Sequence, residues 1–220
     1  MINSWAETAV KEVAAAVHIR VSPAQIGDLV TYLRLLREWN RTINLVSRKR
    51  FDRAVADRLF DALLIWREFE PWDGKSHLDI GSGSGFPAIP IHVMAPEERL
   101  KLVEPRGRRA AFLHVAATDL GFDDVEILSD RIEWRRKGLG ELGKFEFVTA
   151  QAVKPIVQLA PVILENLAPD GRFVWAASGK LGRTDRERVR SSVLNTEITE
   201  VAQERPGGGM CWIGCIRRIV

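Results

Sequence analysis

The sequence predicts an α/β fold: a mainly parallel β-sheet covered by helices on both faces and preceded by a helical extension. Residues 1–70 show helical periodicity, and short apolar strands alternate with helical segments from residue 71 onward. That alternation is typical of a parallel sheet. Two late strands have no helix between them, which predicts an antiparallel edge. We therefore divide the chain into a helical extension, residues 1–70, and a sheet domain, residues 71–220.

Two amphipathic helices are expected in the second half of the extension. Ser22 is a capping residue, Pro23 suits the first helical position, and Gln25 completes a capping box. Apolar residues then recur at helical spacing up to Trp39, namely Ile26, Leu29, Val30, Leu33 and Leu36. After a polar break at residues 40–47, a second stripe predicts another helix, through Val55, Leu59, Leu63 and Trp66.

Strands and helices follow one another along the sheet domain. Strands are expected at residues 77–80, 100–104, 125–128, 145–150, 172–177, 197–201 and 211–219. Helices are expected to end near Met94 and at Gly121 and to span residues 155–167 and 184–194. Gly207, Gly208 and Gly209 lie between the last two strands as the loop of a hairpin.

A glycine-rich turn, LDIGSGSGFP at residues 78–87, follows the first strand and opens a helix. Glycines let the backbone turn tightly and let a ligand approach closely, and such turns form a crevice at the carboxyl ends of parallel strands. The GxGxG spacing favours S-adenosylmethionine (SAM) over a dinucleotide. Glu104 ends the next strand, where its carboxylate can accept both ribose hydroxyls of an adenosine. Asp79 either orients the turn or faces the methionine end of the cofactor.

Basic residues gather in clusters, although the net charge of +3 and the pI of about 9.1 only weakly suggest nucleic acid. The clusters lie at residues 48–50 with Arg53, at Arg106 with residues 108–109, at residues 135–137 and at residues 183–190. Several lie near expected loops or helix ends, where they can contact phosphates. The alternative is that each is an ordinary solvated surface.

The cysteines and the apolar runs bear on cellular location. Cys211 and Cys215 form neither a CxxC pair nor a zinc quartet, and on a strand both point to one face, so we expect reduced core residues. No targeting segment is visible, and no apolar run is long enough to span a membrane. We expect a soluble cytoplasmic protein.

Five segments together resemble the RsmG/GidB family of bacterial small-subunit rRNA guanine-N7 methyltransferases. The resemblance covers residues 32–182, and its most distinctive piece is a tryptophan-asparagine run followed by a second asparagine-leucine. The segments are LLREWNRTINLVS at residues 35–47, the turn at residues 78–87, RRAAFL at 108–113, DRIE at 130–133 and AQAV at 150–153.

The resemblance implies a seven-stranded Rossmann-like class I SAM-dependent methyltransferase that modifies N7 of a guanine in 16S rRNA near the decoding centre. The expected cofactor is SAM, and the expected partner is 16S rRNA or the small ribosomal subunit, with no membrane and the chain acting as a monomer. The candidate cofactor-binding residues are Asp79, Gly81, Gly83, Phe86, Glu104, Pro105, Arg106, Ile132, Glu133 and Gln151. The candidate RNA-binding residues are Asn40, Asn44, Arg48, Lys49, Arg50, Arg53, Arg108 and Arg109.

Three positions depart from the family pattern, and one of them bears on function. Gln151 stands where the family usually has arginine; glutamine keeps hydrogen bonding but loses the positive charge. This change is compatible with weaker SAM binding, an altered substrate or a divergent paralogue. Ala88 and Pro105 replace a glycine and a small hydroxyl residue that are more usual at these positions.

Guanine N7 carries an in-plane lone pair and no proton, so its methylation needs alignment and exclusion of water rather than a general base. No catalytic acid–base residue and no metal ligand are therefore expected. Asn40 and Asn44 either read a base edge or brace the pocket rim, with a helix cap and a turn as the alternatives. Phe86 is expected to contact the cofactor, and Trp39 to lie in the core.

Other functions remain open at this point. Gln151 keeps a small-molecule SAM methyltransferase possible, against which the run at residues 39–47 and the basic clusters argue. A paralogue that binds SAM and RNA with weak or no turnover is a second alternative. An NAD-dependent oxidoreductase is least favoured, because the glycine spacing is wrong and the only tyrosine, Tyr32, lies in the helical extension.

Overall fold

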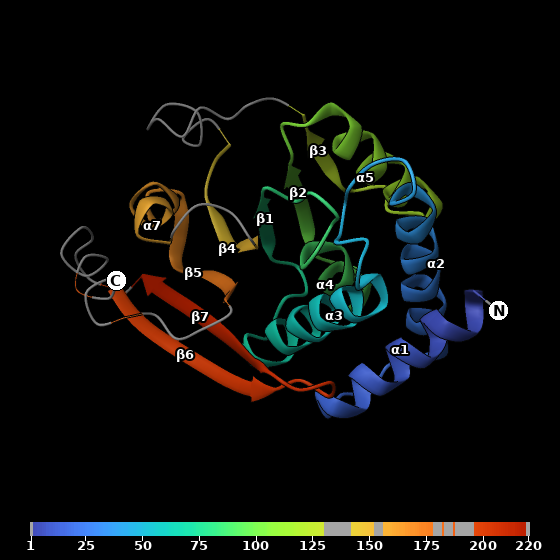
Figure 1. Cartoon of the computed structure of the whole chain (residues 1–220). Helices are drawn as coiled ribbons and strands as arrows, with labels where there is room; N and C mark the ends of the chain where they lie inside the picture. The colour runs from blue at the N-terminus through green and yellow to red at the C-terminus, as the bar shows by residue number, and fades with distance from the viewer. Residues whose placement is uncertain are drawn as a thin grey trace.

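The computed structural model describes residues 2–129, 142–151, 156–177, 182, 187 and 196–218 (Figure 1). Most of the expected helix at residues 184–194, and the segment with Ile132 and Glu133, lie outside the described residues. The helices are α1 (Ile2–Ala16), α2 (Pro23–Trp39), α3 (Phe51–Glu68), α4 (Ala88–Met94), α5 (Gly107–Asp119) and α7 (Ile156–Leu164). The strands are β1 (Ser76–Ile80), β2 (Arg99–Val103), β3 (Glu126–Leu128), β4 (Phe145–Gln151), β5 (Leu167–Ala177), β6 (Thr196–Glu204) and β7 (Met210–Arg218).

The seven strands form one sheet in the order β3-β2-β1-β4-β5-β7-β6. Strands β1 to β5 pair parallel with one another, whereas β7 pairs antiparallel with both β5 and β6. The predicted parallel sheet with an antiparallel edge is confirmed. Because β1 lies between β2 and β4, the ends of these three strands meet at one edge of the sheet.

The expected boundaries hold within about two residues except at the end of β6, which runs to Glu204 rather than residue 201, and around β5. Helix α7 ends at Leu164 rather than residue 167, and Leu167 already pairs with Phe145 of β4. Pairing then shifts register and resumes at Arg172, where the prediction began the strand. The intervening Pro-Asp-Gly is a turn sequence, and Asp170 has φ of 61°, so these residues bulge out of an otherwise continuous strand.

Two hydrophobic clusters cover the two faces of the sheet. The larger joins apolar residues of α1 to α5 to one face, and the smaller joins α7 to the other. Strand residues alternate between them: Phe147 belongs to the first cluster and Val148 to the second. Cys211 and Cys215 are buried free thiols on the face that carries the helical extension, which confirms the prediction of reduced core cysteines on one face.

The end of the β6–β7 hairpin is fixed to α3, beneath which it runs in Figure 1. The buried Asp61 carboxylate of α3 accepts from both Nη2 and Nε of Arg205, with Nη2 2.8 Å from Oδ1. Gln203 donates from Nε2 to the carbonyl of Ala16 at 2.8 Å, which ties the same hairpin to α1. None of the helices in the described part of the chain has the length and apolarity that crossing a membrane would require.

Candidate cofactor and RNA-binding site

The glycine-rich turn joins β1 to α4 and requires glycine for steric reasons. Gly85 has φ of +87°, and a Cβ there would lie 2.5 Å from Cδ1 of Ile89. Gly83 has φ of +52°, and a Cβ there would lie 3.4 Å from Nη1 of Arg109 and 3.6 Å from Oε2 of Glu104. Glycine therefore lets the turn pack closely on α4 and keeps the corner between β2 and α5 open.

Glu104 follows β2 and braces the turn. Its side chain is 3% exposed, and its Oε2 accepts a hydrogen bond from the Gly83 amide at 2.9 Å. Its Oε1 accepts from the Arg106 amide at 2.8 Å. Because each carboxylate oxygen has two lone pairs, both oxygens keep acceptor capacity beyond these backbone bonds. A fixed carboxylate at this corner fits the hydroxyl pair of a ribose.

Asp79 lies at the end of a chain of buried polar side chains. Its Oδ1 accepts from the Thr149 hydroxyl at 2.5 Å, and His77 Nε2 lies 2.8 Å from that hydroxyl. His77 Nδ1 in turn lies 3.3 Å from the buried Glu98 carboxylate, which also faces His92 at 3.3 Å. Burial would raise the pKa of Glu98, but the two histidines outweigh it and hold that pKa below its ordinary value.

Burial raises the pKa of Asp79 to about 6, although the Thr149 hydrogen bond opposes the shift. Its Oδ2 is buried without a hydrogen-bond partner among the described residues. Ser82 donates from Oγ to the Asp79 carbonyl at 3.1 Å, so the backbone of this residue holds the turn. A fully buried acid with one unpaired oxygen is costly to ionise in the free protein.

Replacing Asp79 with asparagine is expected to flatten the pH dependence of stability. The unfolded chain releases this proton near 3.8 and the folded chain near 6, so the folded state binds more protons between these values. The free energy of unfolding of the wild-type protein therefore falls as pH rises through this window, by on the order of 3 kcal/mol. Urea unfolding should show Asp79→Asn gaining stability over wild type from about pH 4 to about pH 7.

Asp123→Asn is the matched control, because Asp123 is exposed. It removes one carboxyl without touching the buried side chains around Asp79. A difference in unfolding free energy between Asp79→Asn and wild type that does not change with pH would show that the buried carboxyl does not titrate in this window.

Gln151, the last residue of β4, contacts an arginine that the sequence analysis did not select. Arg58 of α3 donates from Nη1 to Oε1 of Gln151 at 2.8 Å. Gln151 Nε2 lies 3.4 Å from Oδ2 of Asp61, the carboxylate that holds Arg205. Burial lowers the pKa of Arg58, against the opposing effect of Tyr32 and Asp61. A guanidinium from α3 therefore stands beside the residue at which the sequence suggests a lost positive charge.

A cavity of about 780 Å³ opens between α3, α5 and the segment after α2. Arg109 donates from Nη2 to the Asn44 carbonyl at 2.9 Å, joining α5 to that segment. The structure thus gathers four of the predicted RNA-binding residues and adds Arg58. The full lining is Thr42, Asn44, Leu45, Val46, Ser47, Arg48, Lys49, Arg58 and Arg109.

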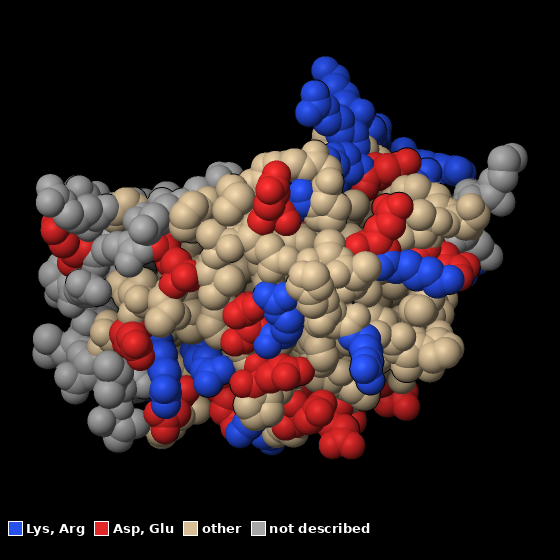
Figure 2. All heavy atoms as spheres, turned by 90° about the horizontal axis from the view of Figure 1, so that it is seen from below, with Lys and Arg blue, Asp and Glu red and all other residues tan. Residues whose placement is uncertain are grey.

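The wall of this cavity carries basic side chains without acidic ones. Four of the lining residues are basic and none is acidic. Seen from below, Figure 2 shows Lys and Arg interspersed with Asp and Glu over most of the face, with one group of basic side chains projecting at an edge. The cavity is therefore suited to an anionic ligand.

Other predicted RNA-binding residues have intramolecular roles or lie outside the cavity wall. Asn40 is 5% exposed and is the C-cap residue of α2, as the cap alternative expected. Its Oδ1 also accepts from the amides of Leu45 and Val46 at 2.8 and 2.9 Å, which braces the segment after the helix. Arg53 pairs with Asp57 and donates from Nη2 to the Gly208 carbonyl at the hairpin, because α3 begins beside that loop. Arg50 and Arg108 are exposed at the starts of α3 and α5, and Pro105 and Arg106, which were predicted to bind the cofactor, are exposed just before α5.

Phe86 lies beneath the turn and packs against the helical extension. Its ring is 2% exposed and meets Tyr32 edge-on, with centroids 5.2 Å apart. The ring therefore belongs to the core, and contact between Phe86 and a cofactor stays a prediction. Trp39 is partly buried and edge-on to Phe112 at 5.9 Å, at the margin of the core.

Tyr32 and Arg58 are the residues that the sequence analysis missed. The Tyr32 hydroxyl, fully buried, donates to the Ser84 carbonyl of the turn at 2.6 Å, and burial raises its pKa. The sequence places each of them on the buried face of its helix. Tyr32 lies within the apolar stripe of α2, and Arg58 follows Val55 by three positions on α3. A polar group at the edge of a buried stripe requires a partner.

Comparisons with solved structures show the same fold. A putative O-methyltransferase from Klebsiella pneumoniae matches with a TM-score of 0.63 at 16% identity, over 99% of this chain and 98% of that one. The O-methyltransferase from Bacillus cereus, solved in complex with SAH, matches with a TM-score of 0.59 at 15% identity, over 99% and 100%. At this identity the likeness concerns the fold alone.

Comparisons of sequence identify the family. "Ribosomal RNA small subunit methyltransferase G" of Chlorobaculum tepidum is 34% identical over 181 residues, covering 81% of this chain and 78% of that protein. The protein of the same name from Halorhodospira halophila is 28% identical over 197 residues, covering 90% of each. The family model described as "rRNA small subunit methyltransferase G" matches residues 25–202. With this match and the geometry of the turn, the chain belongs to the GidB family of rRNA small subunit methyltransferases.

Proposed function

We propose that this chain transfers a methyl group from SAM to N7 of a guanine in 16S rRNA near the decoding centre, acting as a monomer in the cytoplasm. The observation that carries the proposal is the basic cavity of about 780 Å³. Its wall joins the segment after α2 to Arg109, which also lies beside Gly83 of the glycine-rich turn. Membership of the GidB family supports the same reaction.

The residues at the turn fit the cofactor. The Glu104 carboxylate, held by the amides of Gly83 and Arg106, suits the ribose hydroxyls, and the glycine turn permits close approach. The sheet order puts Gln151 of β4 on the opposite side of β1 from Glu104. A nucleoside held at Glu104 therefore directs its amino-acid end toward Gln151 and Arg58. When bound, SAM supplies an electrophilic methyl group on a sulfonium.

Methylation at guanine N7 requires the protein to align the base with the methyl donor and does not require a general base. Guanine N7 presents a lone pair and no proton, so the protein must hold the base in line and exclude water. The segment after α2, which lines the cavity, is held in place by two sets of hydrogen bonds. Arg109 donates to the Asn44 carbonyl, and the Asn40 side chain accepts from the amides of Leu45 and Val46. Arg48, Lys49, Arg58 and Arg109 provide the cations that attract RNA phosphates.

The test is methyl transfer from labelled SAM to small ribosomal subunits purified from cells that lack the endogenous enzyme. We expect one labelled guanine in 16S rRNA. Its position can be located by chemistry that cleaves the RNA chain specifically at N7-methylguanosine. Absence of this product at saturating SAM would contradict the proposal. Faster methylation of free metabolites would indicate a small-molecule methyltransferase, and RNA retention without product would indicate a binding paralogue with little or no turnover. Naked rRNA should be assayed in parallel.

A further inference from the structure

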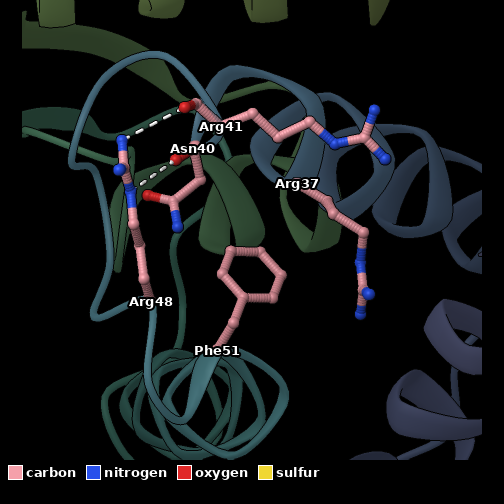
Figure 3. A pocket seen from close by; sticks show the side chains of 5 residues that line it. All are labelled: Arg37, Asn40, Arg41, Arg48 and Phe51. Carbon is pink, nitrogen blue, oxygen red and sulfur yellow. Dashed lines mark hydrogen bonds between the residues drawn. The ribbon is translucent and has the colours of Figure 1, made fainter.

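A second cavity, of about 380 Å³, lies on the helical extension next to the first. It is lined by Arg37, Asn40, Arg41, Arg48 and Phe51 (Figure 3). Arg48 lines both cavities, so they adjoin at this side chain. The second cavity contains no residue of the glycine turn and is therefore not part of the cofactor site.

Two guanidiniums in this wall are available to an anion. Arg48 donates from Nε to the Asn40 carbonyl and from Nη2 to the Arg41 carbonyl, both at 3.2 Å, so its plane is fixed while other N–H groups stay free. The Arg41 side chain makes no hydrogen bond or ion pair with the part of the chain that the structure describes, and in Figure 3 it extends back across α2, away from the Arg48 guanidinium. Arg37, by contrast, is paired with Asp52 at 2.5 Å.

An aromatic ring and an amide complete the cavity. Phe51, the first residue of α3, is partly buried beside Trp5, with ring centroids 6.0 Å apart. The Asn40 Oδ1 is occupied by two loop amides, and Figure 3 shows the amide nitrogen of that side chain directed toward the Phe51 ring. That nitrogen makes no hydrogen bond to another residue of the described ranges. Its N–H groups are free to donate to a base edge.

We propose that this cavity holds one nucleotide of the RNA substrate, adjacent to the base that enters the larger cavity. Arg48 contacts its phosphate, Arg41 contacts a neighbouring phosphate of the same RNA, Phe51 stacks on its base, and Asn40 donates to acceptors on the base edge. The proposal rests on the proposed function, since it assigns a second subsite to the same RNA. An acidic protein segment would use the arginines alone, whereas the ring and the free amide fit a base.

The probe is a short labelled single-stranded RNA of mixed sequence, with binding followed by fluorescence anisotropy at several salt concentrations. Arg41→Gln is expected to weaken binding about fivefold or more and to reduce the slope of log K against log salt by about 0.7. Phe51→Leu is expected to weaken binding by a similar factor without changing the slope, because it removes stacking and no charge. Phe51→Tyr keeps an aromatic ring and should bind as wild type does.

Arg99→Gln is the matched control, since Arg99 is exposed at the start of β2, the end of the strand away from the turn, and its loss changes the charge equally. If Arg41→Gln and Phe51→Leu both bind the RNA with the affinity of Arg99→Gln, the subsite is overturned. If Arg41→Gln weakens RNA binding and Phe51→Leu does not, the assignment of a nucleotide is overturned. The cavity is then a basic patch that also suits acidic protein segments. SAM affinity, measured by calorimetry, should be unchanged in every variant. Failure of the proposed function is recognised separately, as a wild-type protein that binds SAM but methylates no guanine in small ribosomal subunits or naked rRNA.

Discussion

Replacing Glu104 with glutamine is expected to weaken SAM binding about 100-fold or more. The carboxylate is held by two backbone amides and has acceptor capacity left for two ribose hydroxyls. Hydrogen bonds to a charged acceptor contribute about 1.5–3 kcal/mol each, and about 1.4 kcal/mol corresponds to tenfold in affinity. Glutamine also turns an N–H group toward the amide of Gly83 or Arg106, which loses one internal hydrogen bond. Calorimetry with SAM and with its demethylated product measures the effect.

The matched control for this change is Glu97→Gln, which removes an exposed carboxylate before β2. It should bind SAM as the wild-type protein does. Thermal unfolding of both variants separates loss of affinity from loss of fold. We expect Glu104→Gln to lower the free energy of unfolding by about 1 kcal/mol. Near-normal affinity in a folded Glu104→Gln protein would contradict the assignment of this carboxylate to the ribose.

The Arg58–Gln151 pair is expected to give the second large effect. Arg58→Gln should lower kcat/KM about 10- to 100-fold, because a partly buried guanidinium that contacts an oxyanion contributes about 1.5–3 kcal/mol. Gln151→Arg alone is expected to lower activity as well. Gln151 accepts a hydrogen bond from Arg58 at 2.8 Å, so an arginine at position 151 would bring two cations together, and Asp61 is already paired with Arg205.

The exchange variant, Arg58→Gln with Gln151→Arg, again has one guanidinium and one side-chain amide at this pair of positions, with their places swapped. It should therefore be more active than either single variant, a positive coupling in the double-mutant cycle. Binding of the demethylated cofactor and of 5′-methylthioadenosine, which lacks the amino-acid part, shows whether the cation faces the cofactor carboxylate or an RNA phosphate. Additive effects in the cycle would show that the two positions do not share one role.

How far the sequence predicted the fold can be seen at individual elements. The α2 boundaries were predictable because the capping box at Ser22 and Gln25 forms as expected, with Pro23 in the first turn. The bulge in β5 was not, because residues 168–171 read as a turn, and only pairing of Leu167 with Phe145 shows that the strand begins before it. Local signals specify elements, whereas register depends on the neighbouring strand.

The sequence by itself determined the α/β class, the glycine turn and the carboxylate at Glu104, because these follow from periodicity and from residues close together in the chain. Tertiary structure alone decided which cations reach the site. It brought Arg58 to Gln151 and Tyr32 to Ser84, and it placed Arg53 against the β6–β7 hairpin instead of the cavity. The physical reason is that a charge acts according to its distance and its burial, and both are set by contacts between segments far apart in sequence.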